Sequence, residues 1–161
     1  MRFIVDGMLG GLARWLRILG HVVLYDTDSN DTTLLTRAAT EEMILLTRDE
    51  ELYNRAVSKN ISALLVLGES EDERLAQVSR GYGISLTIDM EKTLCPECGS
   101  RLKEASIEEA SGLVPPASLR FYEQFWKCEN SPCGKFYWKG SHWRQINHTL
   151  TRARNLTRLG A

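Results

Sequence analysis

The chain has 161 residues, of which 43% are hydrophobic, and its 20 basic residues nearly balance its 21 acidic ones. A chain of this size can bury one core and carry a small appended module. No apolar run reaches the ~20 residues that a membrane-spanning helix needs. The N-terminus also lacks the basic and hydrophobic regions of a secretory signal, so we expect a cytoplasmic protein without a membrane partner.

Apolar runs of strand length alternate with helical patterns over residues 1–90. Arg2 to Val5 forms the first run, and a helical pattern from Met8 to Leu19 follows Asp6 and ends at Gly20. Further strands are predicted at 21–25, 43–47, 62–67 and 84–88, separated by helices after Asp31, at 52–57 and at 75–78. This alternation predicts βαβ units, and therefore an α/β fold with a parallel sheet flanked by helices.

Acidic residues follow the first three predicted strands: Asp6, then Asp28 and Asp31, then Asp49. The carboxyl ends of parallel strands share one edge, where ligands bind. Carboxylates gathered there repel one another unless a divalent cation is bound, and oxygen ligands suit Mg²⁺ or Mn²⁺. The pattern favours metal-dependent phosphoryl chemistry. The alternative is that these acids cap helices or form turns; Asp31 is a candidate cap for the helix after it, and Asp28 best fits a turn.

Four cysteines form two closely spaced pairs, Cys95 with Cys98 and Cys128 with Cys133. Two such pairs, each followed by glycine, are typical of knuckles around a tetrahedral Zn²⁺. Two disulfides are the alternative, which the missing secretory signal disfavours. Four thiolates close the coordination shell, so we expect this zinc to be structural.

Aromatic and basic residues alternate around the second cysteine pair, a combination that can stack bases and hold phosphates. We expect Phe125, Trp126 and Phe136 to pack this module. Four residues are candidate RNA contacts: Lys139, His142, Trp143 and Arg144. From Gly134 to Ala161 there are six basic residues and no acid, which leaves the rest of the chain acidic. Such a segment is either a polyanion-binding arm or a solvated basic helix.

Three segments together carry a family resemblance, in order over about residues 1–145. They are Asp6-x-Met8-Leu9-Gly10-x-Leu12-Ala13-Arg14-Trp15-Leu16-Arg17-x-Leu19-Gly20, then Leu45-Leu46-Thr47-Arg48-Asp49, then the paired cysteines with Phe136-Tyr137-Trp138-Lys139-Gly140-Ser141-His142-Trp143. They resemble the signatures of the Mut7-C RNase domain family. The resemblance implies a PIN-like nuclease domain at 1–90 and a zinc ribbon at 91–145. The basic tail at 146–161 lies outside it.

The resemblance also implies roles for individual residues. Acidic positions that would hold Mg²⁺ or Mn²⁺ and cleave RNA are Asp6, Asp31 and Asp49, with Asp28 as a further candidate. Basic positions that would meet phosphates are Arg14, Arg17 and Arg48, although arginines on an amphipathic helix are often only solvated. PIN enzymes commonly carry another acid after the fourth strand, and the run Glu69, Glu71, Asp72 offers no clear equivalent.

These observations support three functional hypotheses. The first is a metal-dependent endoribonuclease whose ribbon and tail help to bind RNA. The second is a non-catalytic RNA- or ribosome-binding protein on the same fold, with ribosomal RNA or a ribosomal particle as its partner. The third is a toxin-like nuclease restrained by another protein, which the ribbon disfavours. The sequence leaves the oligomeric state open.

Overall fold

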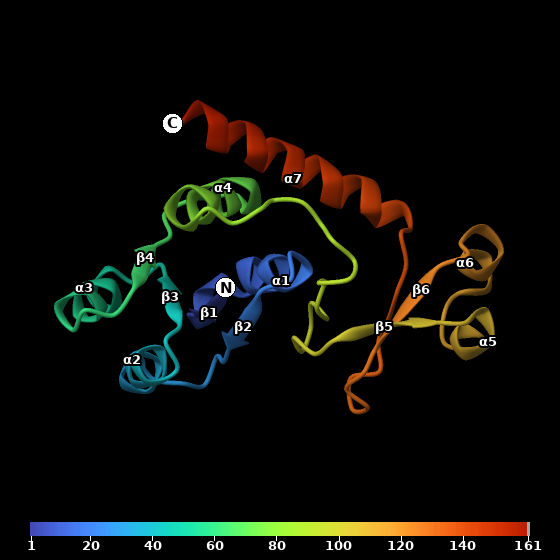
Figure 1. The fold of residues 1–161 in the computed structure, drawn as a ribbon, viewed down its shortest axis with the longest axis horizontal. Coiled ribbons are helices and arrows are strands. Elements are labelled where there is room, and N and C mark those ends of the chain that lie inside the picture. Colours follow the sequence, from blue (N-terminus) through green and yellow to red (C-terminus); the bar gives the residue numbers. More distant parts are fainter. Residues whose placement is uncertain (161) are drawn as a thin grey trace.

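A computed structural model describes residues 1–160 of the protein. Four parallel strands form its first sheet in the order β2-β1-β3-β4 (Figure 1). Their bounds are Arg2–Val5 (β1), Val22–Tyr25 (β2), Ile44–Thr47 (β3) and Ala63–Leu65 (β4). Phe3 of β1 lies opposite Val23 on one side and Ile44 on the other. The α/β fold with a parallel sheet is confirmed.

Helices cover both faces of this sheet. On one face lie α2 (Asp31–Thr40) and α3 (Glu50–Ser58); on the other lie α1 (Gly10–Ile18), after a 3₁₀ turn at Gly7–Leu9, and α4 (Glu71–Tyr82). Successive residues of β1 supply both cores, because Phe3 and Val5 pack in the α1/α4 layer and Ile4 packs in the α2/α3 layer. Burial on both faces explains why the strands read as continuous apolar runs.

The end of α1 follows the prediction at Gly20. This glycine adopts a left-handed conformation with φ +84°. Its N–H donates to the carbonyl oxygen of Arg17 at 3.0 Å, and the N–H of His21 donates to that of Leu16 at 2.9 Å. This pair of hydrogen bonds is a Schellman motif, which turns the chain directly into β2.

The predicted fifth strand at 84–88 is wrong, because this segment follows Gly83 as irregular chain. Ile84 and Leu86 are nonetheless 5% and 4% exposed and pack in the α1/α4 core layer. The hydroxyl of Ser79 donates to the carbonyl oxygen of Ile84 at 2.9 Å. The alternating pattern therefore reflects an extended segment that lies on the core, not one that pairs with the sheet.

A second, antiparallel sheet follows, with strand order β5-β6-β7. Its strands are Leu102–Ala105 (β5), Phe125–Cys128 (β6) and Phe136–Tyr137 (β7). Two short helices, Ile107–Ala110 (α5) and Pro116–Phe121 (α6), occupy the connection between β5 and β6. Phe125 is buried in the small core beside Ala110 and Val114, and Phe136 packs against it. This sheet carries the four cysteines and forms the expected zinc-ribbon-like module.

The last helix, α7 (Ser141–Leu159), runs from the ribbon back across α4 (Figure 1). Leu150 and Ala153 are 1% and 0% exposed and belong to the same core as Phe3. Most of the segment predicted to be a basic tail, 146–161, is therefore a packed helix; residue 161 lies outside the described residues.

None of the helices within residues 1–160 combines the length and the apolar composition needed to cross a bilayer.

Candidate functional site

Asp6 and Asp49 follow neighbouring strands, β1 and β3, and a buried threonine connects them. The hydroxyl of Thr47 donates to Oδ2 of Asp6 at 2.8 Å and accepts from the N–H of Asp49 at 2.9 Å. Thr47 is 0% exposed. The three residues thus form one hydrogen-bonded unit at the carboxyl edge of the sheet. The sequence reasoning missed Thr47, although a hydroxyl ending an otherwise apolar strand was a visible signal.

Both aspartates also act as helix caps. Oδ1 of Asp6 accepts from the N–H of Met8 at 3.3 Å, and Oδ1 of Asp49 accepts from the N–H of Leu52 at 3.0 Å. Capping occupies one oxygen of each carboxylate, and each carboxylate offers about four acceptor sites. Capping and metal binding are therefore compatible at both positions.

Asp31 takes a different role from the expected cap. The N-cap of α2 is Asn30, whose side chain accepts from the N–H of Thr33 at 2.9 Å. Asp31 is the first residue of α2, and its Oδ2 lies 2.8 Å from Nη1 of Arg55 on α3. Within residues 1–160 the structure does not gather Asp31 with Asp6 and Asp49 into one three-ligand group.

Asp28 lies in an exposed turn that a neighbouring carboxylate closes. Asp26 accepts from the hydroxyl of Ser29 at 2.7 Å and from the N–H of Asp28 at 2.9 Å. These hydrogen bonds, that of Ser29 first, lower the pKa of Asp26. The geometry of Asp28 is that of a turn residue, which agrees with the alternative raised from the sequence.

Glu71 is the acid after β4 that lies against α1. A side chain on Gly11 would collide with its carboxylate, so the glycine permits this close approach. Oε1 of Glu71 accepts from Nη1 of Arg74 at 2.9 Å, whereas Oε2 is buried without a hydrogen-bond partner among the described residues. Because α1 and α4 both begin after the carboxyl ends of strands, Glu71 is a further acid of this edge.

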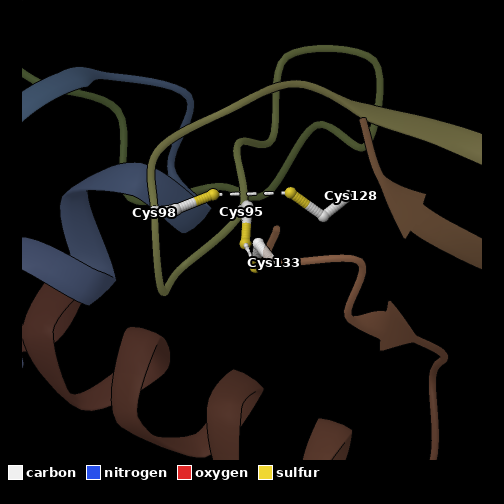
Figure 2. Close-up of side chains that lie close together, drawn as sticks. All are labelled: Cys95, Cys98, Cys128 and Cys133. Atoms are coloured by element: carbon white, nitrogen blue, oxygen red, sulfur yellow. Dashed lines mark hydrogen bonds between the residues drawn. The ribbon is translucent and has the colours of Figure 1, made fainter. Parts of the chain in front are cut away.

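The four cysteine sulfurs point toward one another from the two knuckles (Figure 2). All four lie within 4.8 Å of one another, and the closest pairs are Cys98 with Cys128 at 3.4 Å and Cys95 with Cys133 at 3.7 Å. Tetrahedral Zn–S bonds of about 2.3 Å place sulfurs about 3.8 Å apart, whereas a disulfide requires about 2.05 Å. The cysteines are free thiols, and their donor set and spacing fit a structural Zn²⁺.

Hydrogen bonds and burial shift the pKa values of two of the thiols in opposite directions. Burial raises the pKa of Cys98, but hydrogen bonds from Ser100 outweigh it and lower that pKa to about 6. Burial raises the pKa of Cys128. The hydroxyl of Tyr137 lies within hydrogen-bond distance of the sulfur of Cys95, at 3.1 Å, and burial raises the pKa of this phenol. Such outer hydrogen bonds orient thiolate ligands.

Arg17 attaches the first knuckle to α1. Its side chain is buried, with 6% of the residue exposed, and burial lowers its pKa. Nη1 donates to the carbonyl oxygens of Pro96 at 3.1 Å and Glu97 at 2.8 Å, and Nη2 donates to that of Val23 at 3.1 Å. We therefore assign Arg17 to positioning the ribbon on the sheet domain, where the sequence had suggested phosphate binding.

The other expected cations remain accessible. The side chain of Arg14 is 62% exposed and lies 3.6 Å from Glu97. Arg48 is 29% exposed and lies 3.3 Å from Glu69. Lys139 places Nζ 5.6 Å from the ring of Trp126 and 5.3 Å from that of Trp143.

His142 and Arg144 are exposed in the first turn of α7. Together with Lys139 and Trp143, they place the four candidate contacts of the C-terminal module at the junction of the ribbon and α7.

The family model described as the Mut7-C RNAse domain matches residues 1–150. The comparisons with curated proteins and with solved structures gave no match. The matched range holds both the Asp6–Thr47–Asp49 edge and the four-cysteine cluster, and it covers most of the chain. The chain belongs to the Mut7-C RNase domain family.

Proposed function

We propose that the protein is a metal-dependent endoribonuclease that cleaves RNA phosphodiester bonds at the edge formed by Asp6, Thr47 and Asp49. The observation that carries this proposal is the Thr47 hydroxyl, which bonds the Asp6 carboxylate and the backbone N–H of Asp49 and so ties together two acidic residues that follow neighbouring parallel strands. Membership in an RNase domain family supports RNA as the substrate.

Asp6 and Asp49 are the residues that would hold Mg²⁺ or Mn²⁺. Sites for Mg²⁺ commonly use one or two carboxylates, with water and substrate phosphate completing the shell, so two carboxylates suffice. When bound, such an ion supplies an activated water and neutralises charge at the scissile phosphate. Asp31, which is paired with Arg55, and Glu71, with its unpartnered oxygen, also follow strands of the sheet but are not grouped with Asp6 and Asp49 as ligands among the described residues, so we leave them out of the metal site.

Thr47 would position the acidic residues of this site. Its hydroxyl holds one oxygen of the Asp6 carboxylate and the backbone N–H of Asp49 at the same time. The Asp6 carboxylate and the backbone of Asp49 are therefore fixed before any ion or RNA binds, and the cap bond from Leu52 orients the Asp49 carboxylate. Preorganisation of this kind avoids the cost of ordering the ligands during catalysis.

The RNA would be held by cations outside this edge. Arg48 stands between Thr47 and Asp49 in the sequence, and Arg14 lies on α1, which follows Asp6. Four further residues extend the surface to the ribbon: Lys139, His142, Trp143 and Arg144. The four-cysteine cluster would bind Zn²⁺ as a structural element. Reduced thiolates fit a cytoplasmic setting, and ribosomal RNA is a folded substrate to test beside single-stranded RNA.

The test compares Asp6→Asn and Asp49→Asn with Glu50→Gln, an exposed acid in the first turn of α3. Asparagine caps helices about as well as aspartate, so Asp49→Asn and Glu50→Gln should keep the parent melting temperature. Asp6→Asn keeps one acceptor oxygen for the cap but loses the one that accepts from Thr47, so it should be less stable by about 1–3 kcal/mol and is assayed where it is folded. Cleavage of single-stranded RNA with Mn²⁺ should fall by about 100-fold or more in the two asparagine variants only. Stable variants that cut as fast as the parent would refute the site. A parent that binds RNA but cuts it with no divalent ion would favour the non-catalytic binder.

A further inference from the structure

One carboxylate of the first zinc knuckle lies between two cations from different parts of the chain. Oε2 of Glu97 is 3.6 Å from Nη2 of Arg14, on α1, and 3.6 Å from Nζ of Lys135, which follows the second knuckle. Glu97 itself stands between Cys95 and Cys98. The sheet domain and both knuckles therefore meet at this one side chain.

These ion pairs are loose. Both distances exceed the 2.7–2.9 Å of close charge-assisted hydrogen bonds. The side chains of Arg14 and Lys135 are 62% and 56% exposed, and that of Glu97 is 36% exposed. Exposed ion pairs contribute little to stability, so another anion can replace this carboxylate at small cost.

The backbone of Glu97, by contrast, is held firmly. Its carbonyl oxygen accepts from the buried guanidinium of Arg17 at 2.8 Å. The N–H of Leu94, just before the knuckle, donates to the carbonyl oxygen of Arg17 at 2.9 Å. The position of the knuckle is therefore fixed, whereas the side chain of Glu97 is free to turn away.

Beneath the Glu97 carboxylate lies a pocket of about 370 Å³, lined by Gly10, Gly11, Arg14, Arg17, Tyr25 and Glu97. The hydroxyl of Tyr25 donates to the carbonyl oxygen of Gly7 at 3.0 Å, and Gly7 directly follows Asp6. Tyr25 thus links the wall of the pocket to the residue next to Asp6, which we place in the metal site. The two glycines on the pocket wall are themselves closely approached, Gly10 by the Tyr25 hydroxyl and Gly11 by the Glu71 carboxylate.

We propose that Glu97 takes the place of an RNA phosphate in the free protein. In this account, which rests on the proposed function, a backbone phosphate of the bound strand displaces the carboxylate and is held by Arg14 and Lys135. Arginine and lysine bind phosphate and carboxylate through the same donors. The strand would then run from the Asp6–Asp49 edge across this pocket and over the first zinc knuckle.

The experiment measures binding of a fluorescein-labelled single-stranded RNA by anisotropy, over a range of salt and without added Mg²⁺ or Mn²⁺. Glu97→Gln removes the competing charge and should bind about 3- to 10-fold more tightly, the scale set by two exposed ion pairs. Glu104→Gln, an exposed acid of the same ribbon on β5, is the matched control for net charge. It should change the affinity less than Glu97→Gln does.

Two further variants test the cations without touching a knuckle residue. Arg14→Gln and Lys135→Gln should each weaken binding and reduce the salt slope by about 0.7, the value for one phosphate contact on a single strand. Glu97→Gln should gain less affinity when Arg14→Gln is already present. Zinc content and melting temperature establish that each variant is folded.

The proposal is overturned if Glu97→Gln binds no more tightly than Glu104→Gln, or if both cation variants keep the parent affinity and slope. This failure is distinct from failure of the nuclease proposal. Suppose that the parent cuts RNA, that Asp6→Asn does not, and that Glu97→Gln binds RNA with the parent affinity. This result would reject only the displacement of the Glu97 carboxylate by phosphate. Tighter binding by Glu97→Gln in a protein that never cuts would reject only the catalysis.

Discussion

Thr47→Val is the sharpest test of how the site is organised. Valine has nearly the same shape as threonine but lacks the hydroxyl, so the side chain still fills its buried place at the end of β3. The change removes the hydrogen bond to the Asp6 carboxylate, 2.8 Å long, and the one from the N–H of Asp49, 2.9 Å long. A hydrogen bond to a charged group contributes about 1.5–3 kcal/mol, and a buried unsatisfied N–H costs about 1–3 kcal/mol.

Both hydrogen bonds are only partly buried, so we take the lower half of the summed range and expect Thr47→Val to lower the free energy of unfolding by about 2.5–4 kcal/mol. Thr47→Ser is the matched control, because it keeps the hydroxyl and loses one methyl group, at a cost of about 1 kcal/mol. Urea denaturation without divalent ions measures both effects. In Mn²⁺-dependent RNA cleavage under conditions where both variants are folded, Thr47→Val should be at least about tenfold slower than Thr47→Ser. Equal cleavage rates would show that the hydroxyl does not orient the carboxylates.

Three other predictions concern the zinc, α7 and a partly buried histidine. Cys128→Ser should abolish zinc binding and unfold β5–β7 while the parallel sheet persists, as measured by metal analysis and hydrogen exchange; a zinc-free parent with two disulfides would contradict this. Leu150→Ala should lower the free energy of unfolding by about 2–5 kcal/mol, whereas Leu159→Ala, at an 83% exposed position of the same helix, should leave it nearly unchanged. Burial, and then the adjacent N-terminal ammonium, lower the pKa of His21 from 6.5 to about 4. The unfolded chain therefore binds the extra proton first, and stability should fall by up to about 3 kcal/mol as the pH drops from 6.5 toward 4. His21→Gln should flatten that pH profile, and an unchanged profile would assign the effect to other groups.

The sequence predicted the features that depend on local pattern. Alternating strand and helix periods predicted the four-stranded parallel sheet, and the glycine after Leu19 predicted the end of α1. The spacing of the cysteines left a zinc site or two disulfides open, and the four sulfurs lie together at distances that fit a metal site. Topology also predicted that Asp6, Asp28, Asp31 and Asp49 follow strands at one edge, because parallel strands bring their carboxyl ends together; of these, Asp6 and the backbone of Asp49 share the Thr47 hydroxyl.

The features that the sequence missed depend on choices between neighbours that look alike. Asn30 and Asp31 are both good caps, and only the backbone decides which one stands at the N-cap. Ile84 and Leu86 alternate like a strand, but alternation reports which side is buried and not whether a partner strand is present. In α7 the basic residues masked the spacing of Leu150 and Ala153, which face the core.

Arg17 illustrates the same limit on the scale of the whole chain. The sequence pattern of an amphipathic helix predicts that such an arginine is either solvated or a phosphate ligand. Its actual partners, the carbonyl oxygens of Pro96 and Glu97, are distant in sequence. No local pattern encodes a contact between α1 and a metal knuckle.

The return of α7 to the first domain has a consequence for synthesis on the ribosome. All four strands of the parallel sheet and α4 are translated well before Leu150 and Ala153, so the nascent domain exposes the apolar surface that α7 later covers. Exposed apolar surface of this kind promotes misassembly while a chain is incomplete. The ribbon is made in between, and α7 begins just after its last strand. A ribbon that binds zinc and docks on α1 early would therefore deliver the last helix close to its binding surface and shorten the vulnerable period.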